Sequence, residues 1–261
     1  MNISTSALQE KNAKHLIQSF SDLSYIKNPE STHIISRADG VYIYDNDGKK
    51  ILDSMSGLWC VNMGYGQQSI IEAVNEQMKE LVYYNNFFGS SHPSAIKLSE
   101  MIANKTPEGM NKVYFCGSGS EANDTVVRLA RHYWAAKGKP SKSVIISRTN
   151  AYHGSTMAGA SLGGMSAMHA QGGLPIADIE HVDQPYYYDA CVEACGKIDA
   201  DEFGIKVAQS LAKKIDELGE DRVAAFIAEP IQGAGGVLSL IHISEPTRPL
   251  YISYAGFCVK K

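Results

Sequence analysis

Three short apolar segments alternate with helical patterns in the second half of the sequence, and this alternation constrains the fold more than any other feature. The segments are "VYFC" at 113–116, "SVIIS" at 143–147 and "RVAAFIAEP" at 222–230. Between the last two, apolar residues recur on one face of a predicted helix, at Phe203, Val207, Leu211, Ile215 and Leu218. Short strands that alternate with helices are typical of α/β proteins, so we predict a mainly parallel sheet with flanking helices.

The first half of the sequence predicts an arm and a hairpin. The stretch to about Asn28 is polar and predicts a short helix or arm. Asn46, Asp47 and Gly48 separate two strand-like runs, and these residue types tolerate the positive φ of a tight turn. We therefore expect a β-hairpin at this point.

Apolar periodicity predicts helices from Ser69 and from Ser94, the latter with Leu98, Met101 and Ile102 turned inward. Residues 55–66 and 152–173 are rich in glycine and lack a regular period, so we expect both to be loops.

Composition excludes several classes of protein. Lys and Arg number 24 against 28 Asp and Glu, without a dense basic cluster, so we expect no nucleic-acid partner. Five scattered cysteines lack the paired spacing of a zinc site, and we expect reduced thiols and no metal. Neither a signal peptide nor a long apolar run is visible, which predicts a cytoplasmic protein without a membrane partner.

The turn "GSGSE" at 117–121 lies between a predicted strand and a predicted helix. Unpaired amides at a helix start attract phosphate, and glycine lets a ligand approach the backbone. An ordinary turn between strand and helix remains an alternative. So does a dinucleotide site, because Gly117, Gly119 and Ala122 fit G-x-G-x-x-A; the acid that such a site needs is replaced by Arg148, which would instead receive a 2′-phosphate.

Five segments in order carry a more specific signal: "LWCVNMGYG", "SGSEAND", "AYHGST", "ASLGGM" and "AEPIQGAGGV". On these motifs, from roughly residue 10 to Val237, the sequence resembles the class III aminotransferases, especially the omega-amino-acid or amine:pyruvate branch. The resemblance implies fold type I of the transferases that depend on pyridoxal 5′-phosphate (PLP), and a homodimer in the full-length family. It also implies an amine or amino-acid donor and a keto-acid acceptor such as pyruvate.

The resemblance assigns roles to particular residues. Gly119 and Ser120 match positions that bind the PLP phosphate, and Tyr152 matches the aromatic residue that stacks on the pyridine ring. His153, with the following glycine, matches the same wall of the site. Glu229 matches a glutamate that lies near the pyridinium nitrogen. Each residue taken alone also has a plain structural interpretation, such as a loop tyrosine or a turn carboxylate.

Two aromatic positions match the substrate pocket of the family. Trp59 matches an aromatic residue that lines this pocket in the family, and the resemblance implies that Phe88 or its neighbour Phe87 lines it across the family's dimer interface. The resemblance also divides the chain into an arm and hairpin at 1–55, belonging to the small domain, and a partial PLP-binding large domain at 56–237. Residues 238–261 form a tail unlike the family.

The family's Schiff-base lysine and its pyridinium aspartate both follow the "GAGG" segment, and neither is present here. After Val237 the sequence contains no aspartate, and its only lysines are Lys260 and Lys261. His242 and Cys258 form no recognisable nucleophile pair. We expect that a family sequence is interrupted near Val237 by an unrelated tail, and that this chain folds marginally and binds PLP weakly.

Three alternatives to a transaminase that is truncated and inactive alone remain open. One is a non-catalytic fragment, and another is a different class III PLP enzyme, of mutase or racemase type. The most remote is a nucleotide-binding oxidoreductase domain.

Overall fold

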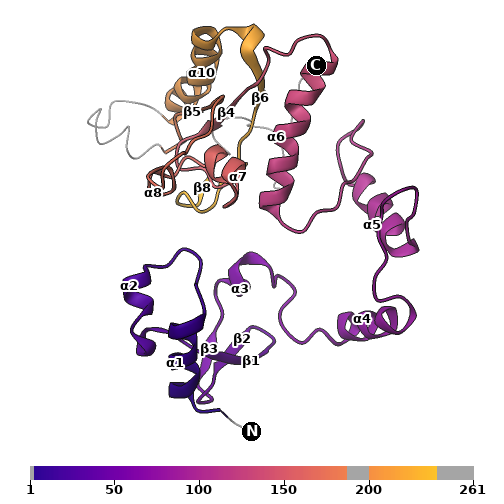
Figure 1. Ribbon diagram of the computed structural model, residues 1–261, viewed down its shortest axis with the longest axis vertical. Helices are drawn as coiled ribbons and strands as arrows, with labels where there is room; N and C mark the ends of the chain where they lie inside the picture. The colour runs from indigo at the N-terminus through magenta and orange to yellow at the C-terminus, as the bar shows by residue number, and fades with distance from the viewer. Residues whose placement is uncertain (1–2, 187–199, 240–261) are drawn as a thin grey trace. The chain divides into compact units, whose positions relative to one another are not determined.

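The computed structural model describes residues 3–186 and 200–239. The chain forms two compact units, Met1–Lys112 and Val113–Lys261 (Figure 1). The domain bounds 1–55, 56–237 and 238–261 stay a prediction, and nearly all of the expected tail lies outside the described residues.

The first unit combines short helices with a small antiparallel sheet in the order β1-β2-β3. Its elements are α1 (Thr5–His15), α2 (Leu23–Ile26), η1 (Pro29–Ser31), β1 (Ile35–Asp39), β2 (Tyr42–Asp45), β3 (Lys50–Leu52), α3 (Ser56–Trp59), α4 (Gln68–Glu80) and α5 (Pro93–Ala103). The predicted hairpin is β2–β3, with Gly48 at φ 87° in its turn. Asn46 in this turn donates to the carbonyl of Ile3 at 3.1 Å, which fixes the start of α1 beside the sheet.

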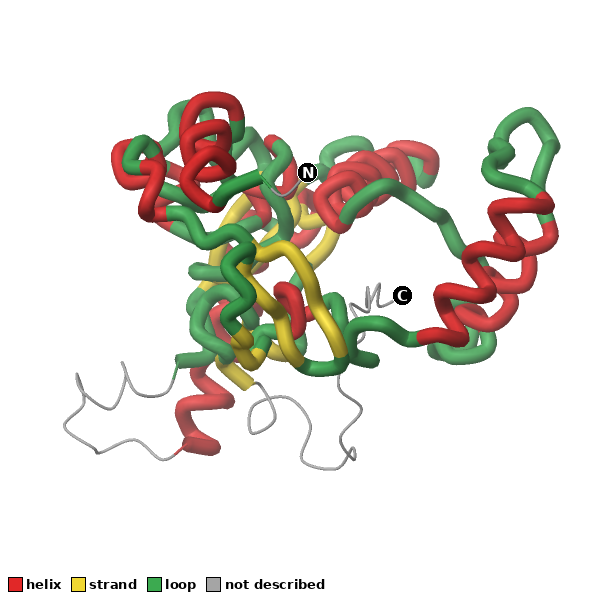
Figure 2. Tube along the Cα trace, turned by 90° about the horizontal axis from the view of Figure 1, so that it is seen from below, coloured by secondary structure: helices red, strands yellow, loops and turns green. Residues whose placement is uncertain are grey.

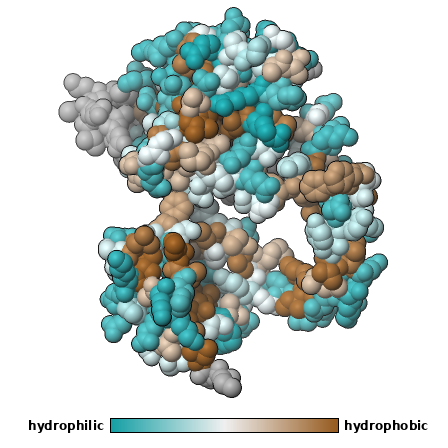
Figure 3. Space-filling model, in the orientation of Figure 1, coloured by the Kyte–Doolittle hydropathy of each residue, from teal (hydrophilic) through white to brown (hydrophobic). Residues whose placement is uncertain are grey.

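Both predicted helices of the first unit are present, as α4 and α5, but their apolar faces are exposed. Side chains of Ile70, Val74 and Met78 on α4 are about half exposed, and Figure 3 shows apolar colour over this part of the molecule. The inward orientation predicted for Leu98, Met101 and Ile102 is therefore wrong within this unit. The helix itself is confirmed, but Leu98, Met101 and Ile102 are 47%, 65% and 36% exposed.

The second unit contains the predicted parallel sheet. Its elements are α6 (Gly119–Ala136), β4 (Val144–Arg148), α7 (Met157–Leu162), α8 (Ser166–His169), β5 (Ile179–Val182), α10 (Ala200–Leu218), η2 (Glu220–Arg222), β6 (Val223–Phe226), β7 (Ile231–Gln232) and β8 (Leu238–Ser239). Strand β4 pairs in parallel with both β5 and β6. Figure 2 draws the strands of both units in yellow. The α/β fold class is confirmed.

Two predictions for this unit fail. Residues 113–116 form no strand, because no described segment pairs with them, and Tyr114 is 66% exposed. The expected loop at 152–173 contains α7 and α8, because Ala158 and Leu162 of α7 pack in the core beside the sheet and Met168 of α8 is buried. The many small residues of this segment give it no clear helical periodicity in the sequence.

The sheet separates two apolar cores. Ile145 of β4 packs with Val127 of α6 and Leu162 of α7 on one face. Val144 and Ile146 lie on the other face and pack with α10, whose predicted buried side is confirmed. Figure 1 shows α6 and α10 on opposite sides of the strands.

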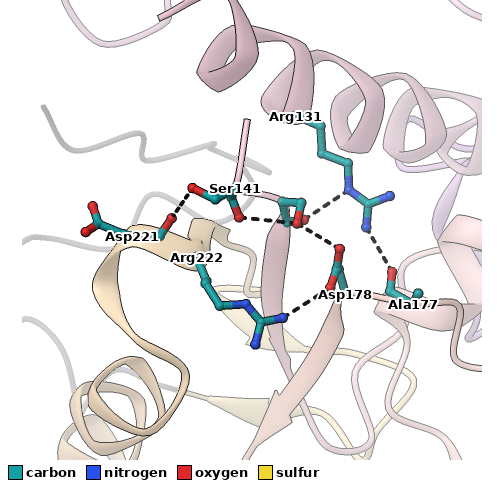
Figure 4. A network of polar contacts seen from close by, with 7 residues as sticks. Arg131, Ser141, Ala177, Asp178, Asp221 and Arg222 are labelled. Carbon is teal, nitrogen blue, oxygen red and sulfur yellow. Dashed lines mark hydrogen bonds and ion pairs between the residues drawn. The ribbon is translucent and has the colours of Figure 1, made fainter. Parts of the chain in front are cut away.

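A polar network ties together the segments that enter the strands at their amino ends (Figure 4). Arg131 of α6 donates to the carbonyls of Ser143 and Ala177, at 3.0 Å each. Asp178 accepts from the Ser143 hydroxyl at 2.7 Å and lies 3.5 Å from Arg222. This network fixes the amino edge of the sheet, whereas ligands of open α/β sheets bind at the carboxyl edge.

Candidate functional site

The amino terminus of α6 presents two unused amides. Ser118 caps the helix: its hydroxyl accepts from the amide of Glu121 at 3.1 Å, and its carbonyl accepts from that of Ala122 at 3.0 Å. Within the described part of the chain, no group accepts from the amides of Gly119 and Ser120. A Cβ added at Gly119 would meet no atom within 4 Å, so the space on that side of Gly119 is open. We call these two amides and the Ser120 hydroxyl the cradle.

Side chains of the first two turns of α6 hold the segment that follows β4. Three hydrogen bonds form this contact: Ser155 N to Ser120 Oγ at 3.1 Å, Asn123 Nδ2 to the carbonyl of His153 at 2.6 Å, and Thr156 Oγ1 to Asp124 Oδ1 at 2.7 Å. The backbone between Tyr152 and Thr156 is therefore fixed beside the cradle. Because Ser120 Oγ accepts in this contact, its hydroxyl proton remains able to donate to an anion.

Gly154 allows this close approach. Its φ is 127°, and a Cβ at this position would lie 2.5 Å from Ser120 Oγ and 2.8 Å from Ser120 Cα. Both the backbone conformation and the lack of space exclude other residues. The glycine of "YHG" is thus required by the packing of this segment on α6.

Glu229 joins the segments that follow β4 and β6. Its Oε1 accepts from the amide of Tyr152 at 2.8 Å, and its Oε2 accepts from the amide of Gly233 at 2.9 Å. Both segments lie at the carboxyl edge of the parallel sheet, on the same side as the cradle. The carboxylate therefore fixes the position of Tyr152 relative to strand β6.

His153 is a neutral, buried imidazole. Its side chain is 8% exposed, and within the described residues its Nε2 has no hydrogen-bond partner. Burial, with a smaller contribution from His181, lowers the pKa of His153 from 6.5 to about 4. The ring is therefore uncharged at neutral pH and can donate or accept at Nε2.

Comparisons with known proteins place this geometry in a family. The aminotransferase class-III family matches residues 25–242, which is most of the chain. This chain belongs to the class-III aminotransferases. Members of this family depend on PLP, which is the cofactor expected from the sequence.

Individual relatives agree with this assignment. A putrescine–pyruvate aminotransferase of Pseudomonas aeruginosa is 54% identical over 237 residues, which cover 91% of this chain and 51% of the relative. A diaminobutyrate–2-oxoglutarate transaminase of Halomonas elongata is 42% identical, over 78% of this chain and 44% of the relative. An (S)-enantioselective omega-transaminase from Thermomicrobium roseum superposes with a TM-score of 0.85 at 33% identity, over 92% of this chain and 52% of that one. The chain spans about half the length of these relatives, and the neighbours confirm fold type I.

The second unit of this class-III aminotransferase fits the PLP cofactor. A phosphate suits the unused amides of Gly119 and Ser120, which lie at the positive end of α6. Gln232 is 1% exposed and donates to the carbonyl of Thr149 at 2.7 Å, and its Oε1 has no partner among the described residues. Unsatisfied buried polar atoms such as Gln232 Oε1 and His153 Nε2 are costly unless a ligand or water satisfies them.

The two predicted substrate aromatics belong to the first unit of the aminotransferase, whereas the residues of the cradle belong to the second. Trp59 is 59% exposed, and Phe88 is fully exposed with φ 55°. Phe87 lies beside Phe88, with ring centroids 6.0 Å apart. Their roles at the substrate stay a prediction.

Sequence reasoning missed the side chains that organise the aminotransferase site. Asn123, Asp124 and Thr156 bind the "YHG" segment to α6, and Gln232 supports the end of β4. A signal did exist for the helix start: Ser118 followed three residues later by Glu121 is the pattern of a capping box. Glu121 here accepts from the amide of Gly117 at 2.6 Å and leaves the cradle amides unused.

Two further findings concern metal ions and membrane spans. Among the described residues, no group of three or more His, Cys, Asp or Glu side chains is arranged to hold a metal ion. In the same part of the chain, no helix has both the length and the hydropathy of a membrane span.

Proposed function

We propose that the protein acts as a PLP-dependent aminotransferase that moves an amino group from putrescine, or a related amine or omega-amino acid, to pyruvate. The family assignment supports the reaction class. The 54% identity to a protein named putrescine–pyruvate aminotransferase supports the choice of donor and acceptor. Because the chain spans about half of that relative, the activity proposed is that of the whole protein.

Each residue of the site has a role in holding PLP. The amides of Gly119 and Ser120 and the Ser120 hydroxyl bind the phosphate. The ring of Tyr152 covers the pyridine, and Glu229 fixes the backbone of Tyr152 through its amide. His153 forms part of the wall as a neutral ring. When bound, PLP supplies the electron-accepting ring that amino-group transfer requires.

No described lysine is assigned to the covalent attachment of PLP. The one described lysine that is buried, Lys142, precedes β4 and donates to the carbonyl of Val223 at 3.3 Å. Both positions lie at the amino edge of the sheet, opposite the cradle. The tail with Lys260 and Lys261 lies outside the described residues, and its origin stays a prediction.

The open cradle beside the "YHG" segment is the observation that carries this proposal, and PLP binding tests it. We expect the chain to bind PLP, as measured by titration of its visible absorbance. Replacement of Ser120 by alanine should weaken this binding about 10-fold, because a hydrogen bond to a charged group is worth roughly 1.5 kcal/mol. Ser210→Ala on α10 removes a hydroxyl that donates to the carbonyl of Val207 in the preceding turn, and it should leave binding unchanged. Equal PLP affinity of the Ser120→Ala and Ser210→Ala variants would contradict the proposal that the cradle binds the phosphate.

The dinucleotide alternative has less support than PLP. The strand that should precede its glycine turn is absent among the described residues, and the Arg148 guanidinium packs 5.5 Å from the ring of Phe226. A chain that binds a nicotinamide dinucleotide and not PLP would reverse this preference. The mutase and racemase alternatives share the cradle, so product analysis of the whole protein separates them: transamination yields alanine from pyruvate only when an amine is supplied.

We further propose a homodimer and a cytoplasmic location. Apolar side chains on α4 and α5 are exposed in this chain. Such exposed apolar surface favours a contact with another surface in the whole protein. Cys60 and Cys116 are exposed free thiols, which fits a reducing compartment.

A further inference from the structure

A side-chain hydrogen bond closes the loop at residues 53–65 of the first unit. The Tyr65 hydroxyl donates to Asp53 Oδ2 over 2.8 Å. The same oxygen accepts from the amide of Gly57 at 2.7 Å, and Oδ1 accepts from the amide of Met55 at 3.2 Å. One carboxylate therefore binds both the far end and the interior of the loop.

Both ends of this loop are also attached to the sheet. The amide of Asp53 donates to the carbonyl of Val41 at 3.0 Å. Gly40 and Tyr65 exchange two backbone bonds, with Tyr65 N to Gly40 O at 2.7 Å and Gly40 N to Tyr65 O at 3.2 Å. The hydrogen bond between Tyr65 and Asp53 thus joins two fixed points, and the chain between them forms a compact surface loop.

The interior of the loop has an unusual backbone. Four consecutive residues have positive φ, namely Ser56 (52°), Gly57 (64°), Leu58 (80°) and Trp59 (65°). L-residues disfavour this left-handed region, so contacts around the segment must hold it there. The bond from Gly57 N to Asp53 is one such contact. A Cβ at Gly57 would lie 2.7 Å from Val61 Cγ2 and 3.0 Å from the Tyr65 hydroxyl oxygen.

Trp59 ends this left-handed segment with a side chain that is 59% exposed. Its orientation consequently depends on the backbone that carries it more than on packing. We propose that Asp53 and Tyr65 are positioning residues that fix Trp59 for recognition of the amine donor. The substrate role of Trp59 in this inference rests on the proposed function. The geometry of the loop does not depend on that function.

The electrostatics of the pair agree with this role. The hydrogen bond from Tyr65 lowers the pKa of Asp53, and the same bond raises the pKa of Tyr65. At neutral pH the carboxylate is charged and the phenol keeps its proton, so the bond is fully formed.

Fluorine NMR of the chain labelled with 5-fluorotryptophan tests the proposal. The sequence has two tryptophans, Trp59 and the partly buried Trp134 of the second unit, and Trp59→Phe assigns the two resonances. We expect Tyr65→Phe to shift or broaden the Trp59 resonance and to leave that of Trp134 in place. Tyr44→Phe, which keeps the ring on which Arg37 packs, should change neither.

A second variant keeps the test decisive. Asp53→Asn retains the size of the side chain and removes its charge. We expect this variant also to shift or broaden the Trp59 resonance and to leave that of Trp134 in place. A Trp59 resonance that both variants leave unchanged, or move only together with Trp134, overturns the inference. Absence of PLP binding by the unaltered chain would instead contradict the proposed function and leave the Trp59 result standing.

Discussion

Tyr152 donates its backbone amide to the carboxylate of Glu229 over 2.8 Å, although 77 positions separate the two residues. The contact joins the segment after β4 to the segment after β6. It makes the position of the predicted stacking ring depend on a side chain that follows a different strand of the sheet.

Replacement of Glu229 by glutamine should therefore affect both stability and PLP binding. The glutamine keeps one acceptor oxygen, so either the amide of Tyr152 or that of Gly233 loses its partner. We expect a loss of about 2 kcal/mol in the free energy of unfolding, measured in urea, because hydrogen bonds to charged groups contribute roughly 1.5–3 kcal/mol. PLP affinity should fall at the same time.

Glu202→Gln is the matched control for this change, because Glu202 is exposed on α10. It should alter neither quantity by more than the roughly 0.5 kcal/mol typical of surface substitutions. Similar effects from both variants would contradict the role given to Glu229.

Replacement of Gly154 by alanine should separate the "YHG" segment from α6. The new Cβ would overlap Ser120, and we expect a loss of about 3 kcal/mol from combined strain and overpacking. Gly236→Ala isolates the backbone contribution, because Gly236 has φ 129° but only ordinary contacts at 3.6 Å. Its expected cost is about 1 kcal/mol. Equal losses in urea unfolding would show that the contact with Ser120 is unimportant.

Acid should destabilise the second unit through His153. The pKa of His153 is about 4 in the folded chain against 6.5 for the free side chain, so the unfolded state binds more protons between these values. The stabilisation is complete above pH 6.5 and falls by up to about 3 kcal/mol as the pH drops towards 4, at 1.36 kcal/mol per unit. The lowered pKa of His181 acts in the same direction.

Urea unfolding at pH 4.5 and 7.5 measures this dependence. His153→Asn should reduce the difference between the two pH values, while His132→Asn, at an exposed position of α6, should preserve it. A difference that survives in His153→Asn would assign the acid sensitivity to other groups.

Local sequence patterns predict most of the regular elements. The features that they do not predict depend on contacts between residues far apart in the sequence. The start of α6 at Gly119 and the strands β4 and β6 follow from turn chemistry and short apolar runs, which are encoded by neighbouring residues. The strand expected at 113–116 has the right composition, but a strand exists only where another segment pairs with it. Glu229 was recognised by its motif, yet its bonds to two amides depend on the fold.

A buried lysine is an obvious candidate for covalent attachment of PLP, and Lys142 is the buried lysine among the described residues. It is 8% exposed, donates to the carbonyl of Val223 and lies 4.5 Å from the centre of the Trp134 ring. These contacts explain its burial structurally, and its position at the amino edge of the sheet separates it from the cradle. Lys142→Met should keep the packing on Trp134 and bind PLP as the unaltered chain does. Reduction with borohydride followed by peptide mass analysis should find no PLP on Lys142, and labelled Lys142 would move the cofactor site to the opposite edge of the sheet.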